Sequence, residues 1–243
     1  MNNKIIYFFL VLLLLSCSKN EITTDTLQTY ITQKSHLAKD EVIACAASDK
    51  NNTDVSYIFY YPILGATNIQ YFETESVNSD KNDFTLYNKV SLEKEDVFNG
   101  YLQRFVRESK NEVWSIVTYE SNNKLHISNP IRLKNSSKPT EWSTSVSIDT
   151  STPLMPKFSW GDGKVKENAI YFQVVTNSDN DLLSGTYTYD KWFQYYKTGN
   201  VVLNVTRDSP PILIKNKEYH FTMMGVSEDN WVNLVIQKQF IGK

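Results

Sequence analysis

After residue 40 the chain is dominated by short runs in which apolar and polar side chains alternate. The stretches VSYIFYY (55–61) and AIYFQVV (169–175) are clear examples, and turn sequences such as SNNK (121–124) and EDN (228–230) separate runs of this kind. A period of two residues predicts β-strands, because successive side chains of a strand point to opposite faces of its sheet. Short strands at intervals of about 8–12 residues indicate a sandwich or barrel.

The pattern divides into two blocks of similar length. A polar, serine-rich stretch with Pro139 lies between them, and alternation restarts behind it. We therefore predict a first β-sandwich over 41–134, a linker over 135–140 and a second β-sandwich over 141–243. Removing residues 1–16 leaves 243 − 16 = 227 residues, which is enough for two domains of about 110 residues each.

The N-terminal end has a different character. Residues 5–15 are an unbroken apolar run of 11 that follows Lys4. As a helix it would rise about 16 Å, roughly half the hydrocarbon thickness of a bilayer, so it is too short to span one. A basic start, a short apolar run and a small residue at its end are typical of a secretory signal peptide, predicted here over 1–16.

The end of this run, Leu14-Leu15-Ser16-Cys17, resembles the lipobox of bacterial lipoproteins. The resemblance implies cleavage before Cys17 and acylation of its thiol and amine, which would anchor the protein in a membrane. Ser18 follows the cysteine, at a position where Asp would resemble an inner-membrane retention signal. An outer-membrane location is therefore expected, and the sequence does not show which face of that membrane carries the protein. We predict a lipidated Cys17 and a polar tether over 17–40, with a short helix after residue 26. A plain secretory signal with a chance cysteine is the alternative.

Charge and cysteine content restrict the possible partners and cross-links. The net charge is −2, or −3 without Lys4, so the chain lacks the net positive charge that favours nucleic acid as a partner. With Cys17 acylated, only Cys45 remains, and no intramolecular disulfide can form. Cys45 lies in the strand-like stretch EVIACAAS, where we expect a buried, unreactive side chain.

The C-terminal third carries a second resemblance. A set of alternating residues before SEDN and WVNLVIQKQF resembles strands F and G of fibronectin type III and related immunoglobulin-like domains: Leu213, Tyr219, Phe221, Met223 and Val226. The resemblance implies that the Tyr219 hydroxyl bonds to backbone a few residues upstream, and that Trp160 of PKFSW packs in the core from strand B. In the first block Trp114 stands where the tyrosine would be. The expected fold is all-β, with two tandem immunoglobulin-like sandwiches.

Motifs of common catalytic sites are absent from the sequence. It contains no GxSxG, GxGxxG or P-loop motif, and His36, His126 and His220 lie 90 or more residues apart, a spacing unlike that of zinc ligands. We predict a protein that is not an enzyme and needs no cofactor. Asp162, Asp179 and Asp181 are candidate calcium ligands on loops, although solvated turn residues are the better explanation of all three.

The aromatic run TYTYDKWFQYYKTGN (186–200) is the main candidate for ligand binding. As one strand it would place Asp190, Trp192, Gln194 and Tyr196 on a single face. Exposed aromatic rings flanked by hydrogen-bonding groups stack on sugars or anchor proteins. The alternatives are that both faces are covered or that a loop interrupts the alternation.

These features together predict a lipid-anchored binding or assembly module of a cell envelope. Its partner would be a glycan or an envelope protein. Two other functions stay open: a structural subunit of an outer-membrane secretion or motility complex, and an enzyme with a site built on loops. The all-β fold by itself implies no reaction.

Overall fold

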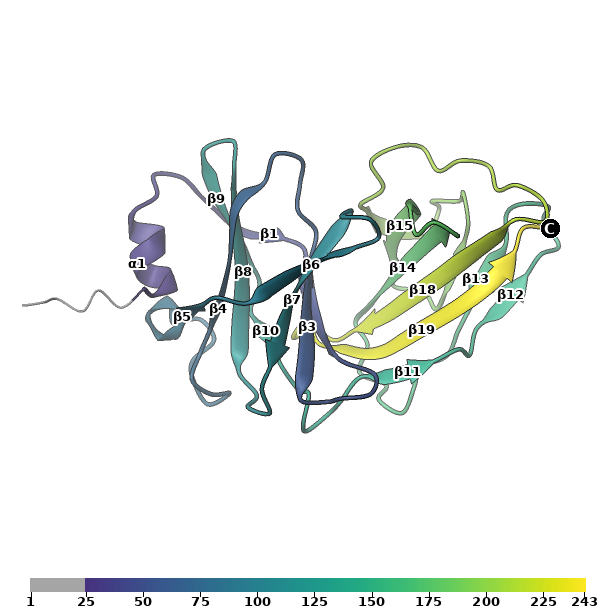
Figure 1. Ribbon diagram of the computed structural model, residues 1–243. Helices are drawn as coiled ribbons and strands as arrows, with labels where there is room; N and C mark the ends of the chain where they lie inside the picture. The colour runs from purple at the N-terminus through teal and green to yellow at the C-terminus, as the bar shows by residue number, and fades with distance from the viewer. Residues whose placement is uncertain (1–24) are drawn as a thin grey trace, which may run out of the picture.

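The computed structural model describes residues 25–243, and nearly all of its regular structure is β-strand (Figure 1). The helical elements are α1 (Leu27–Thr32) and the short 3₁₀ helix η1 (Phe84–Leu86). Within these residues no helix has both the length and the apolar character needed to cross a membrane. The predicted signal peptide 1–16, the lipidated Cys17 and the first part of the tether lie outside the described residues.

The first sandwich consists of two sheets. One contains, in spatial order, β2 (Ala44–Ser48), β3 (Val55–Tyr60), β7 (Leu102–Glu108) and β6 (Glu93–Val97). The other contains β1 (Leu37–Val42), β9 (Lys124–Ser128), β8 (Trp114–Ser121), β4 (Thr67–Glu73) and β5 (Asn88–Val90), with β10 (Ile131–Arg132) also paired to β8. Lettered in chain order, the sheets are A-B-E-D and G-F-C-C′, which is the immunoglobulin arrangement. The first strand is split, since β1 pairs with β9 and β2 with β3 in the opposite sheet.

The second sandwich repeats this plan. Its large sheet contains β11 (Glu141–Ser143), β19 (Val232–Ile241), β18 (Glu218–Val226), β14 (Ile170–Asn177), β15 (Leu182–Thr188) and β17 (Val201–Asn204). The facing sheet contains β12 (Ser147–Asp149), β13 (Lys157–Ser159) and β16 (Trp192–Gln194). These are A-B-E and G-F-C-C′ sheets, with β17 as an additional edge strand. The predicted fold class, all-β with two tandem immunoglobulin-like sandwiches, is confirmed.

Two details of the second core agree with the predicted resemblance. The Tyr219 hydroxyl accepts a hydrogen bond of 2.8 Å from the Ile214 backbone N–H, five residues upstream. Trp160 follows β13 and is buried, and its ring makes an edge-to-face contact with Tyr171 at a centroid distance of 5.7 Å. In the first sandwich, Trp114 at the start of β8 instead donates its indole N–H to the Val77 carbonyl over 3.2 Å. The tyrosine corner is therefore present in the second sandwich and replaced by a different contact in the first.

The segment predicted as a linker, 135–140, is fixed to both sandwiches. The buried Asn135 donates to the carbonyls of Thr53 and Ser109 in the first sandwich. Thr140 and Ser48 exchange two hydrogen bonds of 2.8 and 2.9 Å, and the Thr140 hydroxyl also donates to the Val232 carbonyl in the second sandwich. Because buried polar groups hold both ends, the segment does not act as a free hinge.

The two sandwiches share an apolar interface. Trp231, from the turn between β18 and β19, is fully buried in the core of the first sandwich. Residues of both sandwiches also meet in a common cluster, in which Ala47, Phe59 and Leu102 contact apolar residues of β14, β18 and β19. Relative domain motion is the default unless such an interface is large and hydrophobic. This interface predicts that the pair behaves as one rigid body.

Residues 25–40 correct the prediction of a polar tether over 17–40. The predicted short helix is confirmed as α1, but it is docked on the first sandwich at the end remote from the second (Figure 1). The helical spacing of Leu27, Tyr30 and Ile31 gives α1 an apolar face, which packs against residues such as Phe72 and Ile116. The burial of that face explains why this part of the chain folds back instead of extending.

One carboxylate holds α1 in place. The Glu120 Oε1 atom accepts hydrogen bonds from Lys34 Nζ at 2.8 Å, the Tyr30 hydroxyl at 2.6 Å and Asn68 Nδ2 at 2.5 Å. These bonds, that of Lys34 first, lower the pKa of Glu120 to about 2. In the unfolded chain the pKa is about 4.3. The contribution of ionised Glu120 to the stability of the folded protein is therefore complete above about pH 4.3 and is lost as the pH falls toward 2.

We expect Glu120→Gln to accelerate hydrogen exchange of the backbone amides of residues 27–32 at neutral pH. Acidification of the wild-type protein from pH 4 to 2 should lower the protection factors of the same amides, which compare the observed exchange with the intrinsic exchange rate at each pH. Exchange detected by mass spectrometry would measure both effects, with Glu93→Gln on the exposed β6 as control. Equal exchange in the wild type and Glu120→Gln would show that this carboxylate does not hold the helix.

Candidate functional site

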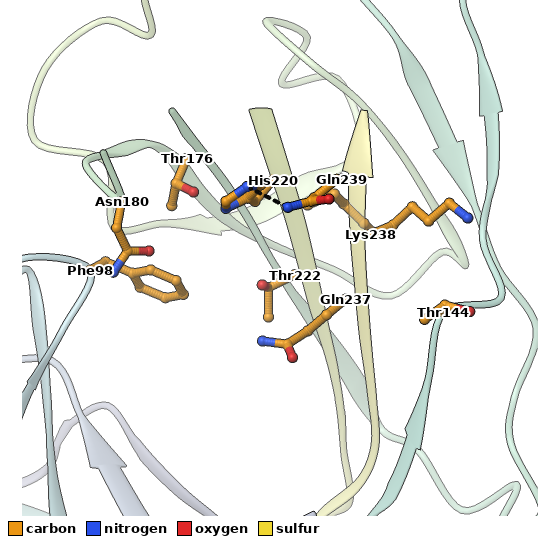
Figure 2. A pocket seen from close by; sticks show the side chains of 10 residues that line it. Phe98, Thr144, Thr176, Asn180, His220, Thr222, Gln237, Lys238 and Gln239 are labelled. Carbon is orange, nitrogen blue, oxygen red and sulfur yellow. Dashed lines mark hydrogen bonds between the residues drawn. The ribbon is translucent and has the colours of Figure 1, made fainter. Parts of the chain in front are cut away.

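The outer face of the large sheet in the second sandwich has an apolar half and a polar half. Phe172, Val174, Met224, Val226 and Val235 form the apolar half, which the first sandwich covers. The polar half lies beyond it on the same three strands, at Thr176, His220, Thr222, Gln237 and Gln239. Figure 2 shows these polar side chains over β14, β18 and β19. The first sandwich therefore covers the apolar half of this face and leaves the polar half uncovered.

The polar half forms the floor of an open hollow of about 540 Å³. Across strands, Thr176 is paired with His220 and Thr222 with Gln237, so their side chains are neighbours on one face. Phe98 and Asn180 complete one side of the hollow. Phe98 belongs to the turn between β6 and β7 of the first sandwich, so the hollow is built by both sandwiches.

The turn that presents Phe98 has an unusual backbone. Phe98, Asn99 and Gly100 have φ angles of 52°, 52° and 81° in succession. Such values are uncommon for residues other than glycine, and they persist only where surrounding contacts impose them. Here the Asn99 side-chain amide donates to the Asp179 carbonyl at 2.9 Å and to Asp181 Oδ1 at 2.7 Å. These bonds attach the turn to the β14–β15 turn of the second sandwich.

The hydrogen-bonding groups of the hollow are largely unused. The buried Thr176 hydroxyl, on a residue that is 2 % exposed, has no partner among the described residues. His220 Nε2 lies 3.3 Å from Gln239 Nε2 and 3.4 Å from Glu218 Oε1. An unsatisfied buried hydroxyl costs about 1–3 kcal/mol, which makes Thr176 a notable feature of this surface.

The predicted single strand over the aromatic run is wrong. β15 ends at Thr188, a turn occupies 189–191, and β16 begins at Trp192 in the opposite sheet. The Thr188 hydroxyl donates to the Asp190 carbonyl at 2.7 Å inside this turn. The loop alternative is therefore the correct one, because the chain crosses between the sheets here and the alternation cannot continue.

The four predicted ligand-binding residues consequently do not share one face. Trp192 and Gln194 are half-buried on β16, where the Lys157 ammonium lies 4.4 Å from the Trp192 ring centre and Gln194 donates to the Met155 carbonyl. Asp190 is exposed and accepts a bond from Asn200. Tyr196, which is 48 % exposed, lines a different hollow beside β15. Ligand binding by these residues stays a prediction, but as separate sites.

The candidate calcium ligands are also separated. Asp162 accepts bonds from Tyr171, Asn168 and Lys191. Burial raises the pKa of Asp162, but these bonds, that of Lys191 first, outweigh it and lower the pKa below its ordinary value. Asp181 is bonded by Asn177 and Asn99 in the β14–β15 turn, near Asp179. Within residues 25–243 no three acidic, histidine or cysteine side chains are grouped to hold a metal ion.

Cys45 lies at the interface between the sandwiches. It packs in the shared apolar cluster, and burial raises the pKa of its thiol to about 12. A thiol with so high a pKa is almost entirely protonated at neutral pH and is a poor nucleophile. This agrees with the predicted unreactive side chain. Of the histidines, His36 is exposed, His126 is buried against Tyr119, and His220 lies on the polar face.

Comparison with known proteins assigns no family. No protein-family model matches the chain, and no curated protein matches it. The solved structures that it is similar to include a segment of two fibronectin type III domains from chicken tenascin, at 9 % identity over 83 % of this chain and 98 % of that chain, with a TM-score of 0.31. The FN1–FN3 domains of chicken CNTN1 are similar at 13 % identity over 86 % of this chain and 68 % of that chain, with a TM-score of 0.29. The receptor tyrosine kinase Torso is similar at 10 % identity over 85 % of this chain and 76 % of that chain, with a TM-score of 0.26. The strand order given above, and not these similarities, defines the fold.

The polar face was not predicted from the sequence, although a signal for it exists. The strands HFTMM (220–224) and IQKQF (236–240) place polar residues at alternate positions that share one face. Once strand pairing is known, these positions coincide on adjacent strands. Phe98 offers no such signal, because its position beside the second sandwich depends on contacts between residues about 80 positions apart.

Proposed function

We propose that this protein is a lipid-anchored binding module of a bacterial outer membrane, which holds its ligand on the polar face of the second sandwich. The observation that carries the proposal is the hollow of about 540 Å³ that both sandwiches build over the polar side chains of β14, β18 and β19. The lipobox sequence that ends at Cys17 supports the anchor. A volume of this size is within the roughly 300–1,000 Å³ common for small-ligand sites.

The arrangement of the chain suits such a role. α1 lies at one end of the elongated pair and the C-terminus at the other (Figure 1). The described chain begins at Asp25, beside α1, so a membrane anchor at Cys17 would precede the end of the first sandwich that is remote from the second. The interface around Trp231 would keep the ligand-binding face in a fixed position relative to that anchored end.

A structural subunit of an envelope complex is a second candidate function. Ile212 and Ile214, which are 72 % and 60 % exposed, flank the buried Leu213 before β18. Exposed apolar side chains of this kind occur at protein–protein contacts. In that case, detergent extracts should yield a partner in fixed stoichiometry that is lost in the variant Ile212→Ser/Ile214→Ser.

The anchor is tested by growing cells that express the protein with labelled palmitate. We expect the wild type to carry label and to sediment with outer membranes, and Cys17→Ser to carry none. Cys45→Ala is the matched control, because Cys45 is half-buried in the apolar cluster between the sandwiches, and its replacement should leave labelling unchanged. An unlabelled wild type, or label that persists in Cys17→Ser, would contradict the anchoring proposal.

A further inference from the structure

The hollow on the second sandwich has the chemistry of a sugar-binding site. We infer that it binds a neutral glycan chain, with the Phe98 ring as an apolar platform and the side chains of Thr222, Gln237 and Asn180 as hydrogen-bonding partners. This inference rests on the proposed function and specifies its ligand class. It places the ligand on a surface different from the aromatic run that the sequence suggested.

The first argument is the type of polar group. Hydroxyl and carboxamide side chains, such as those of Thr222, Gln237 and Gln239, each offer both donors and acceptors. Sugar hydroxyls also donate and accept, so these groups are complementary to them. The residues that line the hollow include no Asp or Glu, and the Lys238 side chain extends away from Thr176 and Thr222 toward the side where Thr144 lies (Figure 2). The lining therefore favours neither a negatively nor a positively charged ligand, and a neutral ligand fits it best.

The second argument is the position of Phe98. Its ring is half-buried and points toward the floor of the hollow, below Asn180 (Figure 2). The C–H groups of a sugar ring pack well on an aromatic face, while the sugar hydroxyls remain free to bond the polar floor. The φ angle of 52° at Phe98 is an imposed conformation, and the Phe98 side chain also packs against the apolar cluster that joins the two sandwiches. The Asn99 bonds to the β14–β15 turn fix this conformation.

A protein partner fits this surface less well. The centres of protein interfaces are enriched in aromatic, methionine and arginine side chains and are largely apolar. Here the lining contains one half-buried phenylalanine, Phe98, while Phe221 is fully buried, and the floor is polar. The hollow is also concave, whereas the apolar half of the same sheet is already covered by the first sandwich.

Binding of the full-length protein, purified in detergent, to immobilised neutral polysaccharides (glucan, mannan, xylan and galactan) and acidic ones (alginate and pectin) would test this inference. We expect binding to at least one neutral polymer and to neither acidic polymer. Gln237→Ala, an exposed position whose replacement leaves both cores intact, and Phe98→Ala should each weaken binding at least tenfold. Trp192→Ala and Gln194→Ala test the rival site that the aromatic run predicts on the opposite sheet, and this inference requires both to bind like the wild type.

Several outcomes would overturn the inference. They are the absence of binding to every neutral polymer, binding only to acidic polymers, and loss of binding in Trp192→Ala but not in Gln237→Ala. Thermal melting of each variant separates a lost site from a lost fold, and Gln237→Ala alone decides the matter if Phe98→Ala unfolds. Positive palmitate labelling with no glycan binding would remove this inference and leave the anchored module intact.

Discussion

Replacing Trp231 with alanine should destabilise the protein by about 3–5 kcal/mol, the usual cost of removing a fully buried tryptophan. The side chain is 0 % exposed, and its indole N–H donates to the Lys138 carbonyl at 2.8 Å. Although β18 and β19 belong to the second sandwich, Trp231 fills the core of the first. The truncation therefore leaves a cavity in one sandwich and removes the contact that joins it to the other.

Urea denaturation followed by far-ultraviolet circular dichroism would measure this effect. We expect one transition for the wild type, because a shared core makes the two sandwiches unfold together, and a much lower midpoint for Trp231→Ala. Trp192→Ala provides the control, since a half-buried surface tryptophan should cost within about 1 kcal/mol. Equal midpoints for the two variants would mean that Trp231 does not connect the sandwiches.

Replacing Glu73 with alanine should cost a similar 3–5 kcal/mol, because it would leave the buried Arg107 charge with backbone carbonyl partners but without a counter-charge. Arg107 of β7 has a side chain that is 5 % exposed, and it donates two hydrogen bonds of 2.6 and 3.2 Å to the Glu73 carboxylate at the end of β4. The Tyr71 hydroxyl donates to the same carboxylate at 2.7 Å. The pair joins the two sheets of the first sandwich across its interior.

The double variant Glu73→Leu/Arg107→Met should regain most of the lost stability, because it removes both charges and fills the space with apolar side chains. Glu95→Ala is the matched control: its partner Arg104 lies at 2.6 Å, but both side chains are partly exposed, and such pairs contribute about 0–1 kcal/mol. Denaturation midpoints of the three variants give the comparison. A cost for Glu73→Ala no greater than that for Glu95→Ala would refute the buried-pair interpretation.

Local patterns along the chain were sufficient to predict the fold class. Alternation located most strands, and the tyrosine corner at Tyr219 was anticipated from a few residues because its hydrogen bond spans only five positions. The predicted domain boundaries, like the lipid anchor, stay predictions. The tether was wrong over 25–40, because the burial of Leu27 depends on partners almost 90 residues away, such as Ile116.

The candidate site could not be derived from sequence for a related reason. The aromatic run looked continuous, but β15 and β16 belong to different sheets, and a one-dimensional pattern does not show where a chain crosses between sheets. The polar hollow depends on the register of three strands and on a turn from the other sandwich. The Arg107–Glu73 pair likewise joins residues 34 positions apart in sequence.

The central claim is that the two sandwiches form one rigid body, so that Phe98 of the first stays beside the polar face of the second. Spin labels on Lys124→Cys and Lys215→Cys, one exposed position in each sandwich, in a background with Cys17→Ser and Cys45→Ala, would report their separation by double electron–electron resonance. The structure predicts a single narrow distance distribution that broadens on introduction of Trp231→Ala. A broad or multimodal distribution in the background protein would contradict it.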